Sequence, residues 1–127
     1  MLHEEKIARL RAGTRNDPAR SAAVELLIGA GLVRDHQPWV VVDESAGTCA
    51  IDFDRATEAV DALTDEHRRW DLTPSSLSVL EVAASIADGL SLHLRHVLPD
   101  LDDEHTVLVM TAIAEAAGHP ETPTAHD

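Results

Sequence analysis

The sequence predicts a mainly α-helical protein, with four or five helices in one compact bundle-like domain and a small β-hairpin near residues 39–53. Three observations predict this fold class. Apolar side chains recur at helical spacing in several segments. Capping residues followed by proline begin two of these segments, and glycine ends most of them. One short run is instead rich in β-branched residues and carries a turn signal, which is typical of a hairpin.

The first two predicted helices occupy the N-terminal third of the chain. Residues 2–12 have a narrow apolar face, so this helix must dock on the rest of the protein to be stable. Residues 16–18 (Asn-Asp-Pro) begin the second helix, because Asn or Asp caps the free amides and proline fits the first turn. The run over residues 19–33 is apolar on most sides, as in a central helix, and is expected to end near Gly29.

The predicted hairpin follows this central helix. Residues 39–42 (Trp-Val-Val-Val) indicate one short strand, residues 43–47 a turn, and residues 48–53 a second short strand. Since a lone hairpin is marginally stable in water, we expect it to pack on the helices.

Two further helices are predicted before residue 90. Asp54 is expected to cap an amphipathic helix with Ala56 and Val60 on its apolar face. The polar residues 64–73 indicate a loop or one helical turn. Thr73-Pro74 then begins a helix that ends at Gly89, where a left-handed residue is expected.

The C-terminal part of the domain is predicted to hold a short apolar piece and a last helix. The short piece covers residues 90–98 and stops at Pro99. Asp102 caps the last helix, which ends at Gly118. The apolar residues that trace this helix at helical spacing are Val107, Met110, Ile113, Ala114 and Ala117.

The domain is expected to span residues 1–118. The composition shifts at residues 64–73, but each of the two lobes alone would be too small for a comfortable core. Residues 119–127 hold two prolines and no apolar run, so we expect a disordered tail there.

Composition and charge exclude several classes of protein. Ten Lys and Arg stand against 23 Asp and Glu, giving a net charge of −13. Such a surface repels phosphate backbones, so no direct nucleic-acid binding is expected. The sequence contains no run of about 18 apolar residues, so no membrane span is predicted, and no secretory signal pattern is present. With Cys49 as its one cysteine, the chain can form neither an internal disulfide nor a thiolate zinc cluster, and a cytoplasmic location is expected.

The sequence does not predict an enzyme, and no cofactor is expected. It has no nucleophile-elbow pattern, no phosphate-binding glycine loop and no Cys-x-x-Cys pair. Cys49 is expected to be a small buried apolar residue, and Ser75 is expected at a helix start for capping.

The most favoured function is therefore a non-enzymatic, protein-binding accessory role. Two charged elements are candidate contact surfaces, and an acidic surface suits a basic protein partner. Their opposite charges could also pair within one chain, or between two chains as a homodimer. The acidic element holds Asp100, Asp102, Asp103 and Glu104, and the basic element holds Lys6, Arg9 and Arg11.

Two alternatives stay open. His93 and His96 are three residues apart, so on a helix they could share a metal or small ligand with Asp100 as a third group. Neighbouring leucines compete for the buried face, and Pro99 separates Asp100 from the helix. The other alternative is an acidic nucleic-acid mimic that inhibits a DNA-binding protein.

Two segments also resemble a known group of proteins. RNDPARSAAVELLIGAG and SSLSVLEVAASIADGLSLHLRHVLPDLDDEHTVLVMTAIAEAAG resemble small, acidic, alanine-rich proteins of high-GC actinobacteria. The resemblance implies a bacterial setting. It brings no catalytic motif and no established activity.

Overall fold

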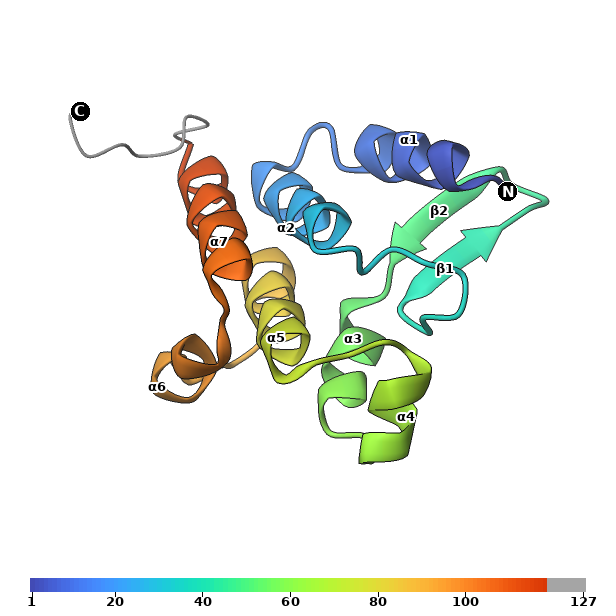
Figure 1. Cartoon of the computed structure of the whole chain (residues 1–127). Coiled ribbons are helices and arrows are strands. Elements are labelled where there is room, and N and C mark those ends of the chain that lie inside the picture. The colour runs from blue at the N-terminus through green and yellow to red at the C-terminus, as the bar shows by residue number, and fades with distance from the viewer. Residues whose placement is uncertain (119–127) are drawn as a thin grey trace.

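The computed structural model describes residues 1–118 and is mainly helical, with one two-stranded antiparallel sheet (Figure 1). The predicted disordered tail, residues 119–127, lies outside the described residues. The elements are α1 (His3–Gly13), α2 (Pro18–Gly29), β1 (Val40–Asp43), β2 (Thr48–Ile51), α3 (Phe53–Val60), α4 (Thr64–Arg69), α5 (Pro74–Asp88), α6 (Leu94–Val97), the 3-10 helix η1 (Leu98–Asp100) and α7 (Asp103–Ala116).

The described residues form seven α-helices, so the predicted number of four or five is too low. The two short helices account for the difference. In α4, acidic residues in the first turn and Arg68 and Arg69 in the last turn suit the helix dipole. Each of these arginines also forms an ion pair with an acidic residue three positions earlier. The piece around Pro99 does not stop as expected. It continues as η1, because proline is tolerated in the first turn of a helix.

Side-chain caps begin several of the helices. Asp17, one of the two residues expected to cap α2, does so, and Thr73 caps α5 and Asp102 caps α7 as predicted. Each accepts a hydrogen bond from a backbone amide three residues later. The cap of α3 is Asp52, not Asp54, and the helix begins at the buried Phe53. Gly89 ends α5 in the left-handed conformation, with φ of 68°.

The two strands pair as predicted and lie against the helical part of the molecule. The register runs from Val40 opposite Ile51 to Asp43 opposite Thr48. Cys49 and Ile51 are buried, and β2 packs under α1. Trp39 precedes β1 instead of beginning it. Its ring is fully buried, and its Nε1 donates to the carbonyl oxygen of Leu32 at 2.7 Å.

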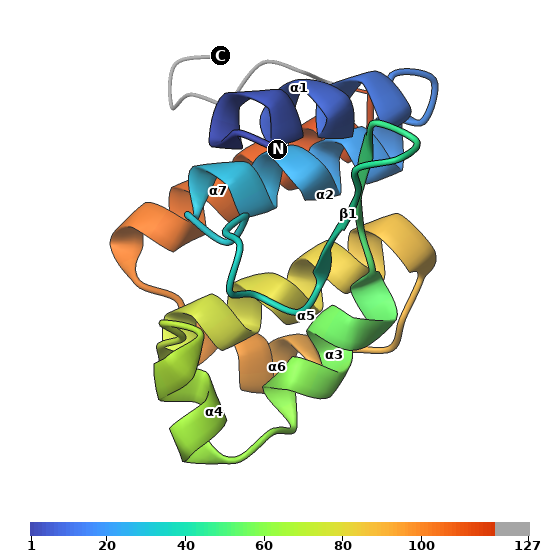
Figure 2. The same ribbon diagram turned by 90° about the vertical axis from the view of Figure 1, so that its right-hand side faces the viewer.

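One continuous core joins these elements. The central helix α2 packs against both α5 and α7, and α3 packs on the other side of α5 (Figures 1 and 2). The core draws side chains from α1, both strands, α2, α3, α5, α6 and α7. None of the helices in the described part of the chain is long and apolar enough to cross a membrane. This arrangement leaves α7 at one edge of the molecule, with one face on α2 and the other turned outward.

Candidate protein-binding surface

The predicted acidic element lies on the surface, where α7 begins. Asp100 belongs to η1, Asp102 is the cap residue of α7, and Asp103 and Glu104 occupy its first turn. All four side chains are exposed. The Asp102 carboxylate accepts the His105 amide at 2.8 Å, so part of this acidity serves to begin the helix.

The predicted basic element is not the free surface that the sequence indicates. Lys6 is only 4% exposed, and its ammonium bonds the carboxylate of Asp35 beside the hairpin. Arg11 bonds Glu25 of α2 at 2.7 Å, and that hydrogen bond and charge raise the pKa of the guanidinium. Arg9 is exposed. The two bonded basic residues therefore pair with carboxylates outside the acidic start of α7, and not with that element.

The structure brings a serine, a histidine and an aspartate together where α5 and α7 begin. The Ser75 hydroxyl lies 2.6 Å from Nδ1 of His105 and accepts the amide of Asp102 at 3.0 Å. In a hydrolytic triad the serine and the carboxylate contact opposite imidazole nitrogens. Here the Asp102 carboxylate also approaches Nδ1, at 3.5 Å, and Ser75 is buried. The arrangement is a structural clamp that ties the start of α7 to the start of α5.

The histidine pair of the metal alternative lies at α6. The rings of His93 and His96 meet edge to face, with centroids 5.9 Å apart, and His93 precedes the helix instead of sharing its face. Within residues 1–118, no group of three or more His, Cys, Asp and Glu side chains has the geometry to hold a metal ion. A hollow of about 410 Å³ lies instead between α1 and the end of α2, lined partly by His3 and Arg34.

Two carboxyl groups of the helices α5 and α7 have a raised pKa. Burial raises the pKa of Glu81 on α5, the charges of Asp61 and Asp100 raise it further, and His93 and His96 oppose the shift. Burial also raises the pKa of Glu115 on α7, with a contribution from Glu25. Both side chains are therefore more easily protonated in the folded protein than in the unfolded chain.

The single cysteine is buried in the core, as the sequence indicates. Burial raises the pKa of the Cys49 thiol, and the charge of Lys6 opposes this effect. Since the thiolate is the nucleophilic form, a buried thiol with a raised pKa is unreactive.

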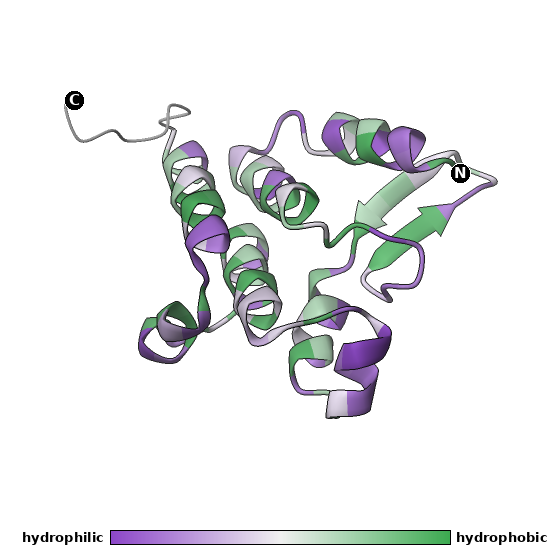
Figure 3. Cartoon of the chain, in the orientation of Figure 1, coloured by the Kyte–Doolittle hydropathy of each residue, from purple (hydrophilic) through white to green (hydrophobic). Residues whose placement is uncertain are grey.

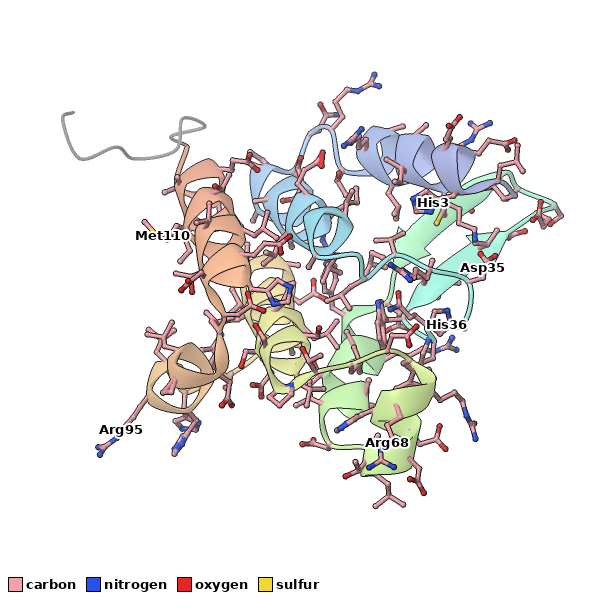
Figure 4. The ribbon with its side chains drawn as sticks, viewed as in Figure 1. His3, Asp35, His36, Arg68, Arg95 and Met110 are labelled. Atoms are coloured by element: carbon pink, nitrogen blue, oxygen red, sulfur yellow. The ribbon has the colours of Figure 1, made fainter. Side chains whose placement is uncertain are left out.

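The feature that the sequence does not indicate is the outward face of α7. The apolar residues that trace this helix in the sequence do not enter the core. Val107, Met110 and Ile113 are 56%, 46% and 53% exposed, while Val109 and Ala112 are buried. Met110 points away from the rest of the molecule (Figure 4). We call the strip of Val107, Met110, Ile113, Ala114 and Ala117 the outer α7 face.

Two contacts on the inner side of α7 fix this orientation. One is the Ser75 clamp at the first turn. The other is a close approach at Gly29, where a Cβ atom would lie 3.0 Å from a methyl carbon of Leu108. Because any larger residue would push Leu108 away, Gly29 allows α2 and α7 to pack closely. With Leu108 and Val109 turned inward, the opposite side of the helix must face solvent.

The outer α7 face has no charged group along its middle. From His105 to Ala114 the helix contains no Asp, Glu, Lys or Arg. Hydropathy colouring shows apolar residues along α7 and polar ones at its first turn (Figure 3). A surface helix normally turns charged and polar side chains to solvent. In a chain with 26% charged residues, this uncharged outward strip therefore departs from the usual composition of an exposed helix face.

Comparison with known proteins gives no relative for this chain: no family model matches it, and no match was found among curated proteins or solved structures.

Proposed function

We propose that this protein is a non-enzymatic, protein-binding accessory module that binds its partner through the outer α7 face. The observation that carries the proposal is the combination of three half-exposed apolar side chains with the absence of charge from residue 105 to residue 114. On soluble proteins, a contiguous apolar patch marks an interaction site more often than apolar residues exposed singly do.

The acidic start of α7 lies at one end of the same surface. Asp103 and Glu104 are exposed in the first turn, beside the apolar strip. Charged groups around an apolar centre are the usual anatomy of a protein interface, in which the rim stays hydrated. The rim carboxylates then set the salt dependence and rate of association, and the apolar centre supplies most of the affinity.

The proposal is tested by affinity capture with matched baits. The tagged full-length chain is compared with Met110→Glu, which places a charge in the centre of the outer α7 face. Leu63→Glu is the control, because Leu63 is 79% exposed but lies between α3 and α4. We expect Met110→Glu to lose the captured protein and Leu63→Glu to retain it. Equal recovery by both variants contradicts the proposal.

A further inference from the structure

We propose that the outer α7 face binds the same face of a second copy of this chain, so that two α7 helices pack antiparallel in a homodimer. This inference rests on the proposed function, since it names the partner of that surface. It differs from a dimer held by charge, because the contact lies in the uncharged part of the helix.

The spacing of the residues suits a helix pair. Val107, Met110, Ala114 and Ala117 follow one another at intervals of three, four and three residues, which is the spacing of a seam between paired helices. The first two are large and the last two are small. In an antiparallel pair centred beside residue 112, Met110 lies opposite Ala114 of the second copy and Val107 opposite Ala117. Each layer then combines a large side chain with a small one, as close packing requires.

A parallel pair does not offer this fit. It would place Met110 against Met110 and Ala114 against Ala114, so that the two crowded layers would lie at one end of the contact and the two loosely filled ones at the other. It would also bring the acidic first turns of both copies together. The antiparallel pair separates them by the length of α7, which has 14 residues and is about 21 Å long.

The polar side chains beside the strip can be buried without losing hydrogen bonds. The Thr106 hydroxyl donates to the carbonyl oxygen of Asp102 at 2.7 Å, and the Thr111 hydroxyl donates to that of Val107 at 3.0 Å. Because both hydroxyls already donate to their own helix, covering them leaves no unpaired donor. The face therefore presents methyl groups where its composition alone would suggest polar ones.

A second copy suits this surface better than the end of the same chain does. Residues 119–127 begin two residues beyond the end of α7, but their sequence, HPETPTAHD, contains no large apolar side chain to cover Met110. Two copies with a net charge of −13 repel each other wherever carboxylates meet, and the middle of the outer α7 face has none. A surface that is complementary to itself gives a closed two-fold dimer, the commonest oligomer.

Sedimentation equilibrium of the full chain tests the dimer. The range should extend from about 1 μM to about 1 mM, because a contact of one helix pair is small and binds weakly. We expect the mass to rise with concentration from 13.7 kDa towards twice that value. Met110→Glu should stay at the mass of one chain, and Leu63→Glu should dimerise like the wild type. A wild-type chain that is monomeric throughout, or a Met110→Glu variant that dimerises equally well, overturns the inference.

Disulfide cross-linking tests the direction of the helices and does not depend on the folding of the charged variant. After oxidation, the double variant Met110→Cys/Ala114→Cys should form a covalent dimer, because the two positions face each other across the antiparallel pair. The single variant Met110→Cys should form much less. Cys49 is buried and does not compete. Efficient cross-linking of the single variant indicates a parallel pair and overturns the arrangement.

Sedimentation equilibrium and affinity capture together separate failure of the dimer from failure of the proposed function. A monomeric wild type whose captured protein is lost in Met110→Glu overturns the second copy as partner but leaves the surface in place. If neither the mass nor the captured protein depends on Met110, both proposals are wrong.

Discussion

The Ser75 clamp determines how firmly α7 is held, and Ser75→Ala measures its contribution to stability. Ser75 is 6% exposed, and its hydroxyl serves both the Asp102 amide and Nδ1 of His105. Removing the hydroxyl leaves two poorly hydrated groups without their partner. An unsatisfied buried group costs about 1–3 kcal/mol, so we expect the free energy of unfolding to fall by about 2–3 kcal/mol.

Urea denaturation followed by circular dichroism gives this value, with Ser85→Ala as the matched control. Ser85 lies on the same helix and is half-buried, and Ala in mid-helix favours helix formation slightly, so the control should lose nothing. In the double variant Ser75→Ala/His105→Ala, the loss should be smaller than the sum of the single losses, because both remove the same hydrogen bond. A loss below about 0.5 kcal/mol in Ser75→Ala, or strict additivity, would refute the clamp.

Three further predictions follow from the described contacts. Lys6→Met should change the free energy of unfolding by less than about 1 kcal/mol, whereas Lys6→Glu should destabilise strongly by burying a carboxylate against Asp35, as thermal melts will show. Glu81→Gln should raise the melting temperature at pH 7. Because folding raises the pKa of the Glu81 carboxyl, its ionisation destabilises the folded protein as pH rises through that pKa, and glutamine cannot ionise. The gain should vanish in acid, below the ordinary pKa of a free glutamate, about 4.3, and an equal gain at pH 7 and in acid would contradict the cause. The Cys49 thiol should react with a chromogenic disulfide reagent only at the rate of unfolding, and fast labelling of the native protein would show that it is accessible.

Local chemistry explains which parts of the fold the sequence predicts. Asp17, Thr73 and Asp102 cap helices as expected, because a capping side chain bonds an amide only three residues away. The hairpin is predicted for the same reason, since β-branched residues and a turn signal lie within fifteen residues of each other. The sequence-based prediction places the cap of α3 at Asp54, two residues after the observed cap, Asp52. This error in the helix boundary arises because Phe53 is needed in the core.

Tertiary contacts explain what the sequence does not predict. Since α7 has apolar residues on all sides between 105 and 114, its spacing cannot say which side is buried. The close approach of Leu108 to Gly29 and the Ser75 clamp make that choice, and both join segments far apart in the chain. The prediction that Lys6 lies on an exposed basic surface is wrong for a related reason. Residue type assigns lysine to the surface, but Lys6 is buried on α1, which packs against β2, and Asp35 bonds its ammonium. The acidic start of α7 is exposed as predicted, and the apolar strip beside it is the part that was missed.

Net charge and the apolar strip together predict how salt affects association, and this prediction separates the two kinds of partner. Two copies with a net charge of −13 repel each other outside their contact, and salt shortens the range of that repulsion from about 10 Å at 0.1 M to about 3 Å at 1 M. Salt should therefore strengthen the homodimer, and the transition in sedimentation equilibrium should move to lower protein concentration. A basic partner bound at Asp103 and Glu104 would show the opposite sign, because salt screens its attraction to those carboxylates. Weaker self-association at 1 M salt than at 0.1 M would mean that charge pairs, and not the outer α7 face, hold the two copies together.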